Sequence, residues 1–164
     1  MKEETSSISI RKATHKDMPI IKECLIDSWV EHAKAVPKLL DGERMRKSKV
    51  DEYYQKCFDE PDKCFVFVAE IKGEFAGFIR ADRKKIANFF KHSETLWLDD
   101  TYVLPSFRRQ GVAHKLTLEV ETLASELGIK RIQSRIYTFN KPMQKLRSSM
   151  GYSSPHATWD KVLE

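Results

Sequence analysis

The fold is decided by the stretch Leu98-Asp99-Asp100-Thr101-Tyr102-Val103-Leu104-Pro105-Ser106-Phe107-Arg108-Arg109-Gln110-Gly111-Val112-Ala113. Its first half is typical of a β-strand, Pro105 begins a short turn, and Gly111 marks the start of a helix. Such a turn presents backbone N–H groups to an anion, and the dipole of the following helix adds to the attraction. Two adjacent carboxylates, Asp99 and Asp100, lie on the strand. The pattern favours transfer of a group from a phosphate-bearing cofactor.

The composition is that of a single globular domain, expected over residues 1–164. The chain has 164 residues, of which 41% are hydrophobic and 32% are charged, which is enough to build one core. No apolar run has the length of a membrane span, and the first residues lack the apolar segment of a signal peptide. We therefore expect a cytoplasmic protein with no membrane partner.

Apolar spacing and turn residues divide the chain into strands and helices. Strands are expected at residues 8–12, 64–69, 75–81, 95–103, 129–138 and 152–163. Helices are expected at residues 17–32, 43–58, 112–127 and 140–150. The strand–helix–strand unit after residue 98 predicts a right-handed parallel crossover, whereas the earlier hairpins are antiparallel. The expected class is α/β, with a mixed sheet flanked by helices in the order β-α-α-β-β-β-α-β-α-β.

Short motifs mark the ends of several elements. Thr14-x-x-Asp17 resembles a capping box at a helix start, and Lys72-Gly73 is typical of a tight hairpin. Residues 83–94 are polar and basic and are expected to form a hairpin loop. Gly128 is expected to end one helix, and Asn140 to cap the start of the next.

The cysteines, the histidines and the net charge indicate which kinds of metal site, redox site and ligand to expect. Three cysteines, Cys24, Cys57 and Cys64, follow no metal or redox spacing, so we expect reduced, mostly buried thiols. The five histidines are scattered, and no metal site is predicted. The net charge of +5 is compatible with an anionic cofactor, with nucleic acid, or with a generally basic surface.

Two motifs resemble those of the GNAT superfamily, the Gcn5-related N-acetyltransferases. Arg108-x-x-Gly111-x-Ala113 resembles the family's R/Q-x-x-G-x-G/A pyrophosphate loop, and Tyr102-Val103-x-Pro105 resembles the lead-in from its fourth strand. Residues 140–152 resemble the downstream N-x-x-A-x-x-L/F-Y-x-x-x-G-F/Y motif. The element order matches the GNAT fold across nearly the whole chain. The resemblance implies an enzyme that transfers an acetyl group from acetyl-CoA to an amine.

The resemblance also implies which residues hold acetyl-CoA. The pyrophosphate is expected on the backbone from Arg109 to Ala113, with charge supplied by Arg108 or Arg109. The Val103 N–H is expected to polarise the thioester carbonyl, as an oxyanion-type donor. The full set of expected cofactor contacts is Tyr102, Val103, Arg108, Arg109, Gln110, Gly111, Val112, Ala113, Asn140 and Arg147.

The acceptor side is expected at Asp99 and Asp100. Acetyl transfer needs a neutral amine, so a base must remove a proton from the ammonium group. By resemblance to GNAT enzymes that act on small amines, Asp99 is the base through a water molecule, and Asp100 helps to hold the ammonium. Strand alternation sends the two side chains to opposite faces. They meet in one pocket only if the strand bulges or a partner subunit contributes, and a homodimer stays open.

The chain departs from the family pattern at the expected proton donor. Arg147 stands where the family has a tyrosine, and arginine does not release a proton near neutrality. Arg147 is expected to stabilise the thiolate by charge, unless water, Tyr137 or Tyr152 protonates it. The leading hypothesis is therefore an N-acetyltransferase that uses direct attack on a small-molecule or protein amine.

Two other functions remain as alternatives. The missing tyrosine is compatible with a catalytically weak acyl-CoA sensor or regulatory module. The basic residues 83–85 beside Phe89-Phe90 are compatible with nucleic-acid binding, but no recognised motif accompanies them, so nucleic acid is not the expected partner.

Overall fold

The computed structural model describes residues 7–163. Its elements are β1 (Ile8–Lys12), η1 (His15–Asp17), α1 (Met18–Ala35), α2 (Gly42–Arg46), α3 (Val50–Asp59), β2 (Cys64–Ile71), β3 (Glu74–Lys85), β4 (Glu94–Val103), η2 (Pro105–Phe107), α4 (Val112–Glu126), β5 (Ile132–Ser134) and α5 (Lys141–Ser149). Within these residues the chain divides into two compact units, one of residues 7–25 and 49–134 and one of residues 26–48 and 135–163. The single domain over residues 1–164 stays a prediction.

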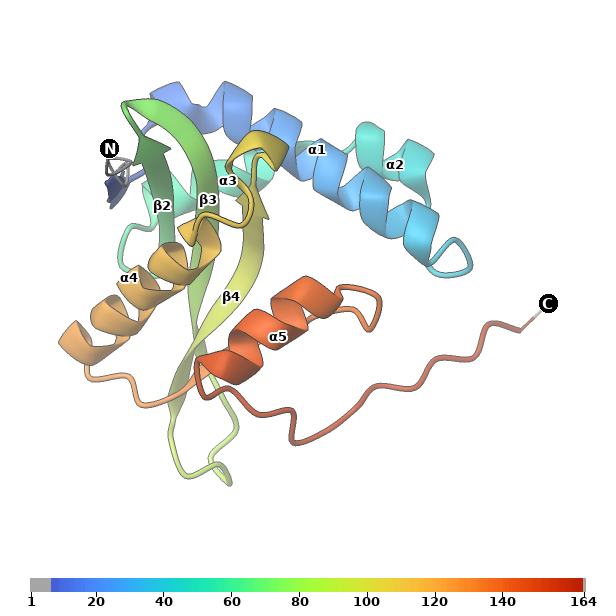
Figure 1. Cartoon of the computed structure of the whole chain (residues 1–164). Coiled ribbons are helices and arrows are strands. Elements are labelled where there is room, and N and C mark those ends of the chain that lie inside the picture. Colours follow the sequence, from blue (N-terminus) through green and yellow to red (C-terminus); the bar gives the residue numbers. More distant parts are fainter. Residues whose placement is uncertain (1–6, 164) are drawn as a thin grey trace. The chain divides into compact units, whose positions relative to one another are not determined.

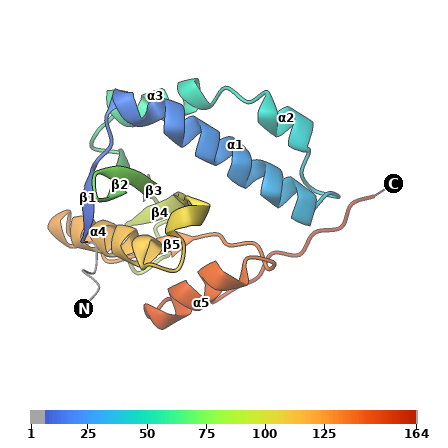
Figure 2. The ribbon, with the colours of Figure 1, turned by 45° about the horizontal axis from the view of Figure 1, so that its top comes forward.

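The first unit contains a five-stranded sheet in the order β1-β2-β3-β4-β5. Figure 1 labels its three central strands, β2, β3 and β4. The first three pairs of neighbours are antiparallel, and β4 pairs with β5 in parallel across α4. The α/β class, the mixed sheet and the parallel crossover are therefore confirmed. Helices α3 and α4 cover opposite faces of this sheet (Figure 2).

The core of this unit lies between the sheet and its two helices. Strand β2 is buried on both faces, as its continuous apolar run predicts, and Phe78 of β3 is fully buried. Leu116 and Val120 of α4 are also fully buried, which confirms the predicted apolar stripe of that helix. Gly128 has a φ of 69° just beyond α4, so the predicted glycine stop is confirmed.

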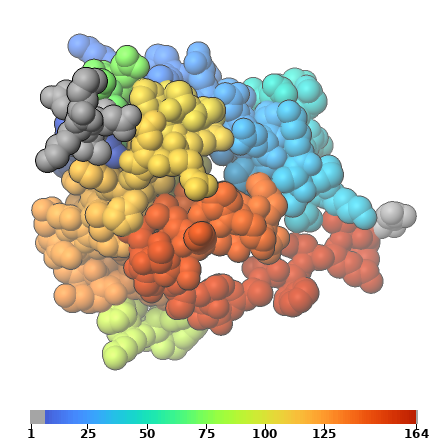
Figure 3. Space-filling view, viewed as in Figure 1, coloured from blue at the N-terminus to red at the C-terminus, as the bar shows by residue number. Residues whose placement is uncertain are grey.

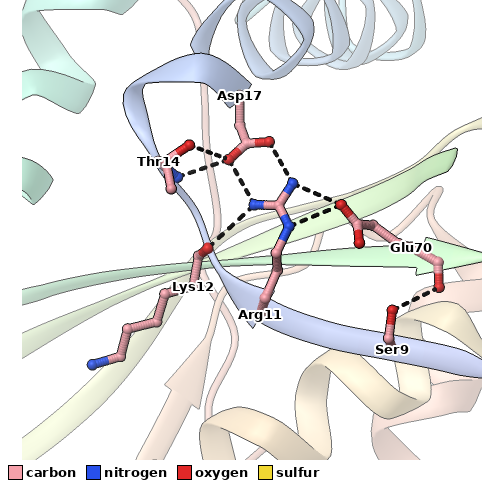
Figure 4. Close-up of polar contacts among 6 residues, drawn as sticks. All are labelled: Ser9, Arg11, Lys12, Thr14, Asp17 and Glu70. Atoms are coloured by element: carbon pink, nitrogen blue, oxygen red, sulfur yellow. Dashed lines mark hydrogen bonds and ion pairs between the residues drawn. The ribbon is translucent and has the colours of Figure 1, made fainter. Parts of the chain in front are cut away.

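A cluster of four polar residues, Arg11, Thr14, Asp17 and Glu70, fixes the end of β1 to the start of the first helix (Figure 4). The Thr14 N–H donates to Asp17 Oδ2 at 2.7 Å, which is the capping contact that the sequence predicts. Arg11 donates to both Asp17 oxygens at 2.8 Å and to Glu70 at 2.8 Å. These bonds to Arg11, aided by Thr14, hold the pKa of Asp17 below its ordinary value. We call this group the N-terminal ion cluster.

The helix expected over residues 43–58 is wrong, because the chain forms two helices there. The Asp41 side chain caps α2, which ends at Arg46, and α3 begins at Val50. The Ser48 hydroxyl donates back to the Arg44 carbonyl at 3.1 Å between them. Each helix also has its own ion pair, Arg46 with Glu43 in α2 and Lys49 with Glu52 at the start of α3.

The strands also differ in length from the expected ranges. The hairpin of β3 and β4 extends to Lys85 and Glu94, where Arg83 pairs with Glu94 at 2.8 Å. Only residues 86–93 form the loop, and its tip projects at the lower edge of the surface (yellow-green in Figure 3). Strand β5 is only three residues long. The strand expected over residues 152–163 is wrong, because this segment has no regular structure; Trp159 there is 93% exposed and supplies no buried face.

The expectation of three reduced cysteines is wrong for two of them. Cys57 in the last turn of α3 forms a disulfide with Cys64 at the start of β2. The short connection between these elements places their Cα atoms 4.5 Å apart, within the range that a disulfide spans. Cys24 is buried and takes no part in this disulfide. Asp82 lies beside the bonded sulfurs, which in this state are not thiolate ligands for a metal.

Within the described residues, no helix is long and apolar enough to cross a membrane.

Candidate active site

A β-bulge in β4 places both acidic residues on one face of the sheet. Ile79 pairs with Thr101 and Ala81 pairs with Leu98, so Asp99 and Asp100 together stand opposite one residue of β3. A bulge of this kind interrupts the alternation of side chains along the strand. Of the two routes that the sequence left open for bringing the carboxylates together, a bulge or a partner subunit, the chain uses the bulge.

Two tyrosines of α3 show that the carboxylates share the face that α3 covers. The Tyr53 hydroxyl donates to Asp99 Oδ2, and the Tyr54 hydroxyl donates to Asp100 Oδ2 at 2.9 Å. Asp99 Oδ1 also accepts a hydrogen bond from Trp97 Nε1 at 3.2 Å. Neighbouring residues of a helix therefore contact neighbouring residues of a strand, which a regular strand would not permit.

The two carboxylates have different surroundings. Asp99 is exposed, whereas Asp100 is only partly exposed. Burial, reinforced by the charge of Asp99, raises the pKa of Asp100 to about 6, although the hydrogen bond from Tyr54 opposes the rise. Asp100 therefore changes its charge close to neutral pH, which is a property of groups that move protons in catalysis.

Arg80 lies opposite the bulge and beneath the tyrosines. Its Cζ atom is 3.8 Å from the centroid of the Tyr53 ring and 5.0 Å from that of Tyr54. Its Nε and Nη2 atoms donate to Asp82 at 3.1 and 3.2 Å, and within the described residues its Nη1 has no hydrogen-bond partner. Arg80 thus supports the aromatic rings and pairs with Asp82, and it makes no ion pair with Asp99 or Asp100, although its charge lowers the pKa of Asp100.

The sequence prediction did not include Tyr53, Tyr54 or Arg80 in the site. The tyrosines fit the apolar spacing of an amphipathic helix, and this spacing does not indicate a polar partner for their hydroxyl groups. An arginine within an apolar strand was the one available signal, since such a residue is rarely buried without partners.

Beyond the bulge, β4 has one open edge. In the described part of the chain, β5 pairs with β4 from Leu96 to Leu98, and residues 99–103 have no neighbour on that side. The Leu96 N–H donates toward β5, whereas the Leu104 N–H donates toward β3, each at 3.0 Å. On a regular strand, the N–H groups of two residues an even number apart, such as Leu96 and Leu104, would point to the same side. Here they point to opposite sides because the bulge lies between them. The Val103 N–H therefore faces the open edge, as its expected role requires.

The turn after β4 has the geometry of an anion-binding loop. Arg109 and Gly111 adopt left-handed φ angles of 66° and 85°, which curl the backbone before α4. The first intrahelical bond of α4 comes from Lys115 to Gly111 at 3.0 Å, so the preceding N–H groups have no acceptor within the helix. Val112 is buried, and the smaller Ala113 is partly exposed at the helix start.

Side chains of this turn are divided between the strand and the solvent. Arg108 Nε donates to the Val103 carbonyl at 3.0 Å, and its Cζ lies 5.5 Å from the centroid of the buried Tyr102 ring. Gln110 Nε2 donates to the Ser106 carbonyl at 3.1 Å. Arg108 thus fastens the turn to the end of β4 through its Nε, and both Arg108 and Arg109 are exposed.

The remaining expected contacts lie in the second unit. The Asn140 side chain accepts a hydrogen bond from the Met143 N–H at 3.2 Å, which confirms its role as the cap of α5. Arg147 is buried, with its Cζ 5.4 Å from the centroid of the Tyr152 ring. Their contacts with a cofactor stay predictions.

Comparisons with known proteins agree with this geometry. Residues 26–152 match the model of the acetyltransferase (GNAT) family. An uncharacterized N-acetyltransferase of Archaeoglobus fulgidus is 28% identical over 153 residues, which is 89% of this chain and 98% of that protein. The aminoglycoside N(6')-acetyltransferase type 1 of Salmonella typhimurium is 30% identical over 94 residues, or 57% of this chain and 65% of that protein.

A solved structure of similar fold is that of AAC(6')-Iy in complex with the bisubstrate analogue CoA-S-monomethyl-acetylneamine. The TM-score is 0.68 at 22% identity, and the match covers 97% of this chain and 99% of that one. At this identity the likeness concerns the fold.

Proposed function

Because the chain belongs to the acetyltransferase (GNAT) family and is an acetyl-CoA-dependent N-acetyltransferase, we propose that its acceptor is a small cationic amine bound at Asp99 and Asp100. The observation that carries this proposal is the bulge, which gathers two carboxylates on one face next to the open edge of β4. Two adjacent negative charges attract a cation that carries more than one amino group. The aminoglycoside acetyltransferase among the relatives acts on amines of this class, which supports the choice.

The residues of the site divide the reaction between them. Asp99, exposed at the surface, holds the ammonium group, and the more buried Asp100 accepts its proton, directly or through water. The neutral nitrogen then attacks the thioester carbonyl, whose oxygen accepts a hydrogen bond from the Val103 N–H. As the tetrahedral intermediate collapses, the C–S bond breaks, the CoA thiolate leaves, and the nitrogen gives up its second proton to water or to that thiolate. This assignment exchanges the roles that the sequence suggested, because a carboxylate with a pKa of about 6 is the better base near neutrality.

The cofactor is proposed to bind along the turn after β4. Its pyrophosphate fits the N–H groups from Arg109 to Ala113, with charge from Arg109. Asn140 and Arg147 are kept as cofactor contacts on the resemblance to the family. A thiol with a pKa of roughly 8.5, by analogy with cysteine, leaves as a thiolate without an obligatory proton donor. The reaction therefore does not require a tyrosine at position 147.

Thiol release over a panel of amines tests the proposal. The panel holds a polyamine, an aminoglycoside, free lysine and a lysine peptide, and turnover is expected to be highest on the small polycationic amines. Turnover on the peptide alone would move the acceptor class to protein amines. Tight acetyl-CoA binding without turnover on any amine would contradict the proposal and support an acyl-CoA sensor.

A matched pair of variants tests the cofactor site. Gly111 has a φ of 85°, and a Cβ there would meet no atom within 4 Å, so Gly111→Ala and Gly111→Asp add backbone strain but no clash. Asp tolerates this conformation better than Ala, so a larger loss in Gly111→Asp reports charge repulsion. We expect acetyl-CoA binding to be abolished in Gly111→Asp. Equal affinities in the two variants would place the pyrophosphate elsewhere.

A further inference from the structure

We propose that Tyr53 and Tyr54 of α3 are positioning residues that give Asp99 and Asp100 different tasks. Tyr54 holds Asp100 as the proton acceptor, and Tyr53 holds Asp99 toward the ammonium group of the acceptor. This inference rests on the proposed function, because it concerns the same two carboxylates.

The two tyrosines differ in burial in the same way as their partners. Adjacent residues of an α-helix project about 100° apart, so one points into the sheet while the other lies at the border of the buried face. Tyr54 is fully buried against Phe78, with the ring centroids 6.3 Å apart, and Tyr53 is 37% exposed. The buried tyrosine contacts the less exposed carboxylate, and the exposed tyrosine contacts the exposed one. The division between Asp99 and Asp100 is thus matched on α3.

Hydroxyl donors suit carboxylates that must act on a cation. A tyrosine hydroxyl fixes a carboxylate by one hydrogen bond and leaves its negative charge in place, whereas a paired arginine would neutralise it. Arg80 is the nearest cation to the pair, but its two bonded nitrogens donate to Asp82. Its guanidinium instead lies against both tyrosine rings and holds them in place. The tyrosine hydroxyl groups in turn orient the two carboxylates.

A pH profile distinguishes this role from simple packing. The titratable and charged groups that interact with Asp100 are Tyr53 and Tyr54 from α3, Arg80 and Asp82 from β3, and Asp99 from β4. Among them, the Tyr54 hydroxyl bonds to the charged form of Asp100 and lowers its pKa. Without this hydroxyl the pKa of Asp100 rises, and the acidic limb of kcat/KM moves to higher pH.

The test compares Tyr54→Phe with Tyr53→Phe in the full chain, with the best amine of the panel. We expect the acidic limb to move up by about one pH unit in Tyr54→Phe, with activity recovered at pH 8.5. In Tyr53→Phe the limb is expected to shift less, whereas the KM for the amine rises several-fold and the KM for acetyl-CoA does not change. An acidic limb that stays in place in Tyr54→Phe would overturn the proposal.

A second measurement needs no turnover. In protein labelled with ¹³C at the aspartate carboxyl carbons, the Asp100 signal is assigned by its loss in Asp100→Asn and titrated in the wild type and in Tyr54→Phe. A higher midpoint in the variant supports the positioning role, and an unchanged midpoint contradicts it, even if no amine is acetylated. Phe keeps the ring contact with Phe78, and melting curves of both variants check that they are folded.

Discussion

The N-terminal ion cluster and the carboxylate pair of β4 lie in the same compact unit but hold their aspartates in opposite ways. Asp17 is bonded by the Arg11 guanidinium and the Thr14 N–H, which hold its pKa below the ordinary value. Asp100 is bonded by one tyrosine hydroxyl and lies beside a second carboxylate, and burial raises its pKa to about 6.

We propose that the difference separates a structural carboxylate from a functional one. A carboxylate that is already paired with a cation of the protein stabilises the folded state. A carboxylate that has only hydroxyl donors keeps its charge at a cost in free energy, and such a site suits a cationic ligand. The comparison therefore predicts that Asp17 affects folding and Asp100 affects turnover.

The largest expected effect is that of Asp100→Asn on turnover. Asn cannot accept a proton, so kcat is expected to fall at least about 100-fold at pH 7.5. The unfolding free energy is expected to stay constant or rise, because a partly buried charge is removed. Thiol-release kinetics and denaturant unfolding check both values. A stable variant with wild-type kcat would contradict the role of Asp100 as the proton acceptor.

Asp17→Asn is the matched change in the N-terminal ion cluster. The change removes the buried negative charge that pairs with Arg11. We therefore expect the unfolding free energy to fall by about 2 kcal/mol. The activity of the folded fraction is expected to equal that of the wild type. A fall in kcat at full folding would show that the cluster acts on the site.

The pH dependence of stability is expected to have opposite signs at the two aspartates. The folded pKa of Asp100 lies above 3.8, so the folded state binds the proton more readily and stability rises as pH falls from above 6 toward 4. The folded pKa of Asp17 lies below 3.8, so its contribution is lost as pH falls further. The rise in unfolding free energy that comes from Asp100 amounts to about 3 kcal/mol at most. Denaturant unfolding from pH 8 to 3 measures it, with Asp100→Asn as the variant that lacks the rise.

The smallest expected effect is that of Asp99→Asn. Loss of one exposed charge is expected to raise the KM for the amine about five-fold, as for a surface ion pair. The charge of Asp99 raises the pKa of Asp100, so its removal shifts the acidic limb of kcat/KM to lower pH. A steep loss of kcat instead would return the role of base to Asp99, as the sequence suggested.

Much of the fold could be predicted because its signals are local. The apolar run of β2, the stripe of α4 and the glycine after it each reflect one element and its own burial. The Asp99-Asp100 pair and the turn from Arg108 to Ala113 were found in the same way.

The arrangement of the site depends on pairing between distant segments, which a single strand does not reveal. The bulge exists only relative to the register of β3, and Tyr53 and Tyr54 join the site only because α3 packs on that face. The same reason accounts for the disulfide, since Cys57 and Cys64 meet through the packing of a helix on a strand.

The most direct measurement is a crystal structure of the chain with a bisubstrate analogue made from CoA and its best amine. We predict the amine nitrogen within hydrogen-bond reach of Asp99 or Asp100, and the pyrophosphate on the backbone from Arg109 to Ala113. Asp99 and Asp100 should both face α3. A nitrogen bound away from both carboxylates, or a regular β4 with its aspartates on opposite faces, would contradict the account.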